Sequence, residues 1–325
     1  MRVCLYYKAV DKPWGGTNRF ILNLAKFLLS RGIDISAGPG DCDVLLLNGA
    51  YKAPGKMLDP RQIKRLRQGY RGFWGLFGKR TARPAIVYRL DGLRGFYSGA
   101  ASAMDSIQLE CLSYVDYVVF QSRFAAGIFA QKGFIGGDFK IIHNGVDQDI
   151  FNCRGRKFWD KKEKLKIISS SWSSNLNKGH ESIARFSQLP GVEVSFIGQW
   201  PKELDAKNVR LSGPLNADGL SQAYRQAHVF LFPALHEACP NTVLEAISCG
   251  LPVMYLESGG TPEVAGGYGA LIRGRDEAGC LEEMRAGYDS FVANIIRDMD
   301  KFSIEHVGAK YLEVFDRAMS CPKSN

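Results

Sequence analysis

Two carboxylates in the second half of the sequence are spaced so that both lie beside the start of one helix. Glu237 follows a short apolar run, and Glu245 falls in the first turns of a helix predicted to begin at Asn241. Asn241 is a favourable N-cap residue, and Pro240 before it fixes the entry of the chain. The next amides, around Thr242–Leu244, have no partners within a helix, so they suit a phosphate or a developing negative charge.

The carboxylates themselves favour a sugar rather than an anion. A carboxylate facing a pyrophosphate repels it, whereas one carboxylate accepts two hydrogen bonds from a pair of sugar hydroxyls. The pattern therefore suggests a nucleotide sugar, with Glu237 and Glu245 each on a diol and the amides on the anion between them. The alternative is that both carboxylates only complement the dipole of the helix, as acidic residues in first turns often do.

Short β-rich runs alternate with helical stretches from end to end, which indicates βαβ units and parallel sheets. The predicted strands are 2–7, 43–47, 85–89, 114–120, 140–143, 165–171, 192–197, 209–211, 229–233, 252–256 and 269–272. The predicted helices are 17–31, 61–70, 100–113, 123–132, 180–187, 218–226, 241–249, 278–300 and 303–319. The stretch 147–166 is rich in charge and has no periodicity, so it is predicted to be an interdomain linker.

The chain is therefore predicted to be α/β, with two Rossmann-like domains and a ligand cleft at the carboxyl ends of their strands. With 325 residues it is long enough for two domains. The first is expected over 1–150 and the second, nucleotide-sugar-binding domain over 151–302. A composition of 46% hydrophobic and 23% charged residues excludes a disordered or fibrous protein.

The composition also suggests where the protein works. No apolar run reaches the ~20 residues of a membrane span, and the eight cysteines include no C-x-x-C pair. We therefore expect a cytoplasmic protein with reduced thiols. The net charge of +9 lies entirely in residues 1–150, which hold 21 Lys+Arg against 12 Asp+Glu, whereas residues 151–325 hold 21 of each. A basic half suggests a phosphorylated metabolite, acidic lipid or nucleic acid as partner, or simply a solvated helix face.

The segment from Phe232 to Val253, FPALHEACPNTVLEAISCGLPV, resembles the retaining glycosyltransferases of family four (group 1 type), which adopt the GT-B fold. Five further segments resemble that family in the right order. They are Gly15-Gly16 through Arg19, Gln121-Ser122 with Asn144 through Asp147, Asn177 through His180, Gly259 through Glu263, and the terminal helix within 303–325. In the family this last helix crosses back onto the first domain. The resemblance covers nearly the whole chain.

The resemblance implies a role for each matching residue. Gly15 and Gly16 let the backbone approach a diphosphate, and Lys178 is the cation on its β-phosphate. Glu245 accepts from the ribose hydroxyls, while Glu237 lies beside the transferred sugar. Taken alone, the glycine pair would be an ordinary turn and Lys178 an ordinary surface lysine.

The sequence departs from the family at two positions. Many members have an arginine five residues before the lysine, where this chain has Ser173. A hydroxyl brings no charge, so Arg19 and Arg89 are candidates to supply it. The second departure is a missing histidine, since none precedes His143; Asp91 falls at that strand end, either to accept a hydroxyl or as a turn residue before a glycine.

No metal or other cofactor is expected. Asp41-Cys42-Asp43 matches a D-x-D metal motif, but it follows Gly-Pro-Gly and is explained as a turn. Basic residues at 61, 64, 65 and 67 and aromatic residues at 73, 74 and 77 lie in the basic half. They suit a membrane interface or a groove for single-stranded nucleic acid, with a partly buried acceptor-side loop as the simpler explanation.

Together these patterns predict a retaining glycosyltransferase that moves a sugar from a UDP- or GDP-type donor to a hydroxyl. The acceptor is expected to be a glycan or lipid-linked sugar in polysaccharide or glycolipid assembly, with peripheral contact to an anionic membrane and no specific nucleic acid. The alternatives are a weak or inactive sugar-nucleotide-binding homologue, encouraged by Ser173 and the missing histidine, and a nucleotide-sugar epimerase on the same fold.

Overall fold

The computed structural model describes residues 1–7, 15–49, 59–67, 83–98, 102–134 and 137–320, which form two compact units. The first comprises the described residues of Met1–Asp11, Phe20–His143 and Glu305–Asn325. The second comprises those of Lys12–Arg19 and Asn144–Ile304. Each unit is a parallel sheet with helices on its faces, as the alternation of strands and helices predicted.

The first unit contains a six-stranded parallel sheet of order β2-β1-β3-β4-β5-β6. Its strands are β1 (Arg2–Tyr6), β2 (Asp34–Ile35), β3 (Val44–Asn48), β4 (Ala85–Leu90), β5 (Tyr117–Phe120) and β6 (Phe139–Ile141). Its helices are α1 (Gly15–Ser30), α2 (Pro60–Arg67), α3 (Arg94–Ser98), α4 (Ala103–Cys111), α5 (Arg123–Ala130) and α11 (Ile304–Ser320). The first turn of α1, through Arg19, and the first residue of α11 are counted with the second unit. Strands β3, β4 and β5 are buried throughout, because helices cover both faces of the sheet.

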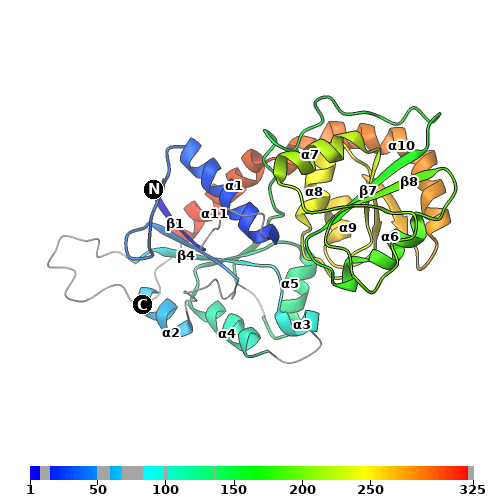
Figure 1. Cartoon of the computed structure of the whole chain (residues 1–325). Helices are drawn as coiled ribbons and strands as arrows, with labels where there is room; N and C mark the ends of the chain where they lie inside the picture. Colours follow the sequence, from blue (N-terminus) through cyan, green and yellow to red (C-terminus); the bar gives the residue numbers. More distant parts are fainter. Residues whose placement is uncertain (8–14, 50–58, 68–82, 99–101, 135–136, 321–325) are drawn as a thin grey trace. The chain divides into compact units, whose positions relative to one another are not determined.

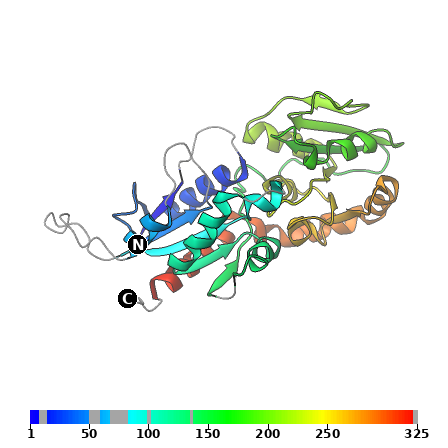
Figure 2. The ribbon, with the colours of Figure 1, turned by 90° about the horizontal axis from the view of Figure 1, so that it is seen from below.

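Helices α1 and α11 pack together in this unit, on the face of the sheet opposite α2 and α4 (Figure 1). The rings of Phe20 and Tyr311 lie 5.5 Å apart. Gly308 of α11 packs so closely on Phe27 that a Cβ atom there would overlap its ring. The view from below shows α4 in front of the strands (Figure 2). The C-terminal helix therefore completes the core of the first unit.

The second unit contains another six-stranded parallel sheet, of order β12-β11-β10-β7-β8-β9. Its strands are β7 (Leu165–Ser171), β8 (Val192–Gly198), β9 (Arg210–Ser212), β10 (Val229–Phe232), β11 (Val253–Leu256) and β12 (Gly269–Ile272). Its helices are α6 (His180–Phe186), α7 (Ala217–Gln226), α8 (Asn241–Ser248), α9 (Thr261–Ala265) and α10 (Glu277–Asp298). One core cluster contains residues of α7, α8 and α9, and the other contains residues of α6 and α10.

The strand order of the second sheet locates its ligand-binding edge. If β7 is numbered as the first strand, the order across the sheet from β9 to β12 is 3-2-1-4-5-6. This is the Rossmann arrangement, in which the direction of winding reverses between the first and fourth strands. These two strands are β7 and β10, which pair at Val229↔Ile167 and Phe230↔Ile168. The loops that leave their carboxyl ends diverge to opposite faces, so a crevice is expected there.

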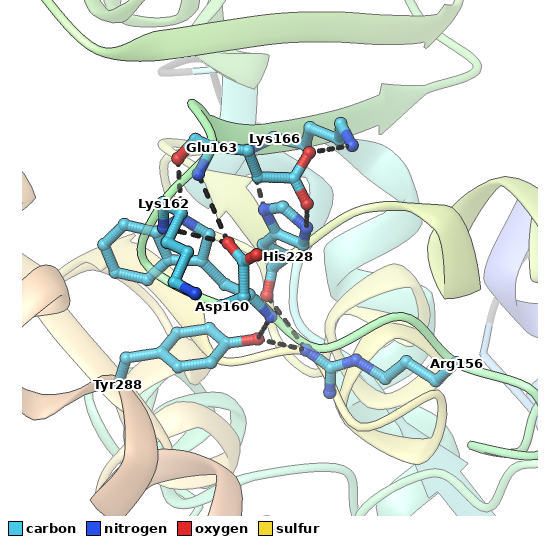
Figure 3. A network of polar contacts seen from close by, with 8 residues as sticks. Arg156, Asp160, Lys162, Glu163, Lys166, His228 and Tyr288 are labelled. Atoms are coloured by element: carbon cyan, nitrogen blue, oxygen red, sulfur yellow. Dashed lines mark hydrogen bonds and ion pairs between the residues drawn. The ribbon is translucent and has the colours of Figure 1, made fainter.

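The charge-rich stretch that was predicted to be a linker is part of the second unit and is held to it by a polar network (Figure 3). Arg156 Nη2 donates to the carbonyl of His228 at 3.0 Å and to the hydroxyl of Tyr288 at 3.1 Å. His228 is fully buried; its Nδ1 accepts from the amide of Lys166 at 3.1 Å, and its Nε2 lies 3.3 Å from Glu163. Burial lowers the pKa of His228, which favours this neutral, hydrogen-bonded ring.

Candidate functional site

Lys178 and Glu237 meet at the carboxyl ends of β7 and β10, the two strands at which the winding reverses. Lys178 ends the short 3₁₀ turn Leu176–Lys178 after β7, and Glu237 lies in the loop between β10 and α8. Their side chains form an ion pair between Lys178 Nζ and Glu237 Oε1, and each is about one-third exposed. The two residues that were predicted to contact the donor's phosphate and sugar therefore lie together at the expected edge.

The loop that carries Glu237 is fixed on two sides by neighbouring loops. Its Leu235 amide donates to the carbonyl of Asn177 at 2.8 Å, next to Lys178. On the other side, the amide of Gly260 donates to the carbonyl of Glu237 at 2.7 Å. Gly259 has φ +65° and lies so close to Glu237 that a Cβ atom would collide with its backbone. The turn at Gly259 and Gly260 thus sets the backbone position of Glu237.

Replacing Gly259 with alanine should destabilise the protein more than replacing Gly274, a matched glycine in the same unit. Gly274 has φ +62° with open space around its Cβ position, so Gly274→Ala should cost only the left-handed conformation, about 1–2 kcal/mol. Gly259→Ala must also displace the backbone of Glu237, for a total of about 3 kcal/mol or more. Denaturant unfolding of both variants measures the difference. Equal losses would show that the close approach contributes nothing.

Helix α8 begins at Asn241, as predicted, but its N-cap residue differs from the prediction. Pro240 is the N-cap residue, and its carbonyl accepts from the amides of Val243 and Leu244 at 3.1 and 3.3 Å. The prediction that Asn241 caps the helix is therefore wrong, and so is the expectation that the amides through Leu244 have no partners. Thr242, in the first turn beside Asn241, is half-buried.

The side chain of Asn241 instead holds the first turn of α1. Asn241 Nδ2 donates to the carbonyl of Gly16 at 2.7 Å, and its Oδ1 accepts from Asn144 Nδ2 at 2.6 Å. A Cβ atom at Gly16 would lie only 3.1 Å from Asn241 Nδ2, which explains the glycine there. Gly15 and Gly16 are thus the first residues of α1 rather than a loop. Asn144 belongs to a segment that resembles the family, but no pattern in the sequence indicates that its side-chain amide donates to Asn241.

Glu245 lies one helical turn after Asn241 and is paired with Arg19, which lies one turn after Gly16. Arg19 Nη1 and Glu245 Oε1 are 2.6 Å apart, and the guanidinium lies 5.3 Å from the centre of the Phe151 ring. Glu245 is 3% exposed. Burial raises the pKa of the Glu245 carboxyl, and the charge and hydrogen bond of Arg19 act in the opposite direction. Arg19 therefore offsets part of the cost of burying a carboxylate at this position.

The remaining predicted residues lie further from these pairs or in the other unit. Ser173 follows β7, and its Oγ accepts from the amide of Asn175 at 3.2 Å, within the turn that leads to Lys178. Asp91 follows β4 in the first unit, where Tyr97 donates to its backbone carbonyl at 3.0 Å. Arg89, one of the two candidates for an additional cation, is 1% exposed; it bonds to Asn48 and lies over the Phe20 ring at 4.0 Å.

Within the part of the chain that the structure describes, no cluster of three or more His, Cys, Asp or Glu side chains could hold a metal ion. The two carboxylates of the D-x-D sequence both bind Arg2. Asp41 pairs with its guanidinium at 2.6 Å, and Asp43 accepts from its backbone amide at 2.7 Å. None of the helices in the described ranges is long and apolar enough to cross a bilayer.

The basic helix α2 presents a charged face in the first unit. Asp59 and Gln62 exchange hydrogen bonds of 2.8 and 3.0 Å between side chain and amide, which closes the start of the helix. Ile63 and Leu66 are buried. Residues 61, 64 and 65 are exposed, and Arg67 is half-buried. The aromatic residues predicted to accompany this face, Phe73, Trp74 and Phe77, lie outside the described residues.

Comparison with known proteins finds similarity in the segment that carries these side chains. Residues 173–289, which contain Lys178, Glu237 and Glu245, match the family model described as glycosyl transferases group 1. Over 164 residues the chain is 28% identical to the sulfoquinovosyl transferase SQD2 of Arabidopsis thaliana, covering 45% of this chain and 32% of that protein. Over 88 residues it is 32% identical to the phosphatidylinositol N-acetylglucosaminyltransferase gpi3 subunit of Schizosaccharomyces pombe, covering 24% and 19%. The matches thus span about a third and a fifth of these relatives.

The likeness to solved structures extends over the whole chain. The structure of Anabaena HepE in complex with UDP and glucose has a TM-score of 0.67 at 14% identity, and the match covers 97% of this chain and 99% of that one. The parallel sheets of the two units agree with that fold. The chain therefore has the two-domain α/β GT-B fold, and its residues 173–289 are similar to the group 1 glycosyl transferases.

Proposed function

We propose that the protein transfers a sugar from a nucleotide diphosphate sugar to a hydroxyl of an acceptor, with retention of the anomeric configuration. The observation that carries this proposal is the meeting of Lys178 and Glu237 at the point where the second sheet reverses its winding. A cation suited to a departing phosphate and a carboxylate suited to a sugar hydroxyl are adjacent there. Glu245, on the helix that follows, is assigned to the ribose.

In the proposed reaction, the bond between the anomeric carbon and the β-phosphate oxygen breaks, and its electron pair leaves with the nucleoside diphosphate. Lys178 stabilises the charge that accumulates on this leaving group. The acceptor oxygen bonds to the anomeric carbon on the same face, and its proton passes to the departing phosphate. Glu237 orients the transferred sugar through a hydroxyl. Asp91, in the first unit, is proposed to accept a hydroxyl of the sugar or acceptor.

The donor is proposed to be of the UDP type, with GDP as the other option, because the similar HepE structure contains UDP. Screening nucleoside diphosphates and their sugars for thermal stabilisation identifies it, since a ligand that binds the native state raises the unfolding midpoint. The proposed metal independence adds that stabilisation and transfer persist in excess EDTA. Failure of every nucleotide to stabilise the protein would overturn the proposed function. Donor turnover without an acceptor would instead indicate an epimerase.

The acceptor is proposed to be anionic or lipid-linked and presented at the cytoplasmic face of a membrane. The whole net charge of +9 lies in residues 1–150, and α2 exposes part of it. The name of the gpi3 relative also contains a lipid, phosphatidylinositol. A polybasic surface gains about 1 kcal/mol per Lys or Arg near acidic lipid, and salt screens this attraction.

Changing the four basic residues of α2 to glutamine should strongly reduce co-sedimentation with vesicles of acidic phospholipid. The variant is Arg61→Gln, Lys64→Gln, Arg65→Gln and Arg67→Gln. A matched control removes the same charge from four exposed positions of the second unit, 162, 164, 202 and 210, and should bind as wild type does. Wild-type binding should also fall as salt is raised. Binding indifferent to salt and to the α2 changes would leave the charge without a role at membranes.

A further inference from the structure

Four charged side chains of the second unit form two separate ion pairs, Lys178 with Glu237 and Arg19 with Glu245. Their formal charges cancel, yet the proposed donor brings a diphosphate with at least two negative charges. Charged donors bind an anion more strongly than neutral ones do. Both cations are occupied by carboxylates in the structure. We therefore expect donor binding to give at least one of them a new partner.

The two carboxylates have the alternative partners that such an exchange requires. Under the proposed function, Glu237 and Glu245 accept hydrogen bonds from sugar and ribose hydroxyls, which replace the bonds that the cations now supply. Glu245 is 3% exposed, so a replacement donor is needed whenever Arg19 turns away. The ribose and the cation are thus exchangeable partners of one buried carboxylate.

Arg19 is placed to make this exchange. Its side chain is 21% exposed, whereas that of Glu245 is 5% exposed, so the guanidinium forms the accessible side of the pair. Gly16, one turn earlier on α1, is held to the start of α8 by Asn241, where the phosphates are predicted. The bond to Glu245 uses only one N–H group of the Arg19 guanidinium. A guanidinium offers five donors in a planar fork that matches phosphate oxygens.

The structure also separates Arg19 from the other candidates for this role. Ser173, five residues before Lys178, contributes a hydroxyl that bonds to the amide of Asn175 and carries no charge. Arg89 is buried in the first unit, against Asn48 and the Phe20 ring. Arg19, by contrast, belongs to the same unit as Lys178 and contacts a residue assigned to the nucleotide.

We propose that Arg19 is the second phosphate-binding cation of this protein, held by Glu245 when no donor is bound and transferred to the diphosphate when the ribose takes its place. This inference rests on the proposed function, because it assumes that Glu245 receives the ribose. It assigns to Arg19 the charge that Ser173 does not supply.

The test compares two ligands that differ by one phosphate. Calorimetric titration with the stabilising nucleoside diphosphate and with its monophosphate is carried out on wild type and on Arg19→Gln. The affinity for the diphosphate should fall about tenfold or more, since a charge-assisted hydrogen bond is lost. The affinity for the monophosphate should fall clearly less, and Arg19→Lys should retain part of the difference. The matched control is Arg31→Gln. Arg31 directly follows the end of α1, and its guanidinium also lies 5.3 Å from a ring centre, that of Phe27.

Each outcome has one meaning. Equal losses for both ligands would show that Arg19 acts only by orienting Glu245, and an unchanged diphosphate affinity would show that it is not used; either overturns the inference while leaving the proposed function intact. If wild type binds no nucleotide, the proposed function falls and the inference with it. Arg19→Gln together with Glu245→Gln leaves no unpaired buried carboxylate, so a lower diphosphate affinity in that folded double variant than in Glu245→Gln alone excludes misfolding as the cause.

Discussion

Replacing Lys178 with glutamine should lower the rate of sugar transfer about 100- to 1000-fold, because the departing phosphate loses the charge that stabilises it in the transition state. Glutamine retains a donor and a similar length but no charge. The side chain is 31% exposed and paired only at its tip with Glu237, so the fold should survive the change. Turnover of the identified donor at saturating concentration measures the loss. The effect on binding of the intact donor should be smaller, since the leaving-group charge develops as the bond breaks.

Lys202→Gln is the control for this experiment, because Lys202 is an exposed lysine of the same unit in the loop after β8. It should transfer sugar at the wild-type rate. If Lys178→Gln and Lys202→Gln behave alike, the leaving group is stabilised elsewhere and the assignment of Lys178 is wrong. A large rise in KM with unchanged turnover would place Lys178 in ground-state binding only.

Most of the secondary structure could be predicted because it depends on local patterns. The runs 165–171 and 269–272 were predicted as strands and form β7 and β12 with the same bounds. The short elements escaped prediction. The two residues of β2 and the five of α9 are too few to show a period, and Gly259 and Gly260 made the α9 region look like a turn. The order of the strands is set by long-range pairing and has no local signal.

The residues of the candidate site likewise include some that local patterns predict and others that depend on long-range contacts. Glu237, Glu245 and Lys178 could be proposed from residue type and spacing next to predicted strands. Their partners could not, since Arg19 and Glu245 are 226 residues apart and Gly16 and Asn241 are 225 apart. The N-cap prediction failed for that reason. Asn241 is a good cap by local propensity, but its side chain bonds to distant segments instead, and the carbonyl of Pro240 receives the first amides of the helix.

The two glutamates should respond differently to substitution. Glu245→Ala should weaken binding of the plain nucleoside diphosphate about 10- to 100-fold, because the proposed ribose contact is present with or without the sugar. Glu237→Ala should leave that affinity close to wild type and lower the transfer rate about 100-fold, because its proposed partner is a hydroxyl of the transferred sugar. Titration with the nucleoside diphosphate and turnover of the intact donor separate the two effects.

The buried position of Glu245 calls for a second variant in this comparison. Alanine leaves both a cavity and an unpaired Arg19, so part of any loss could come from the fold. Glu245→Gln keeps the volume and an acceptor oxygen but removes the charge, and it should weaken nucleoside diphosphate binding while its unfolding midpoint stays closer to wild type. Glu237→Gln, at a position about one-third exposed, should again spare the nucleotide. Equal losses of nucleotide affinity at both positions would mean that the glutamates do not divide ribose from transferred sugar, and unchanged affinity in Glu245→Gln would remove the ribose assignment.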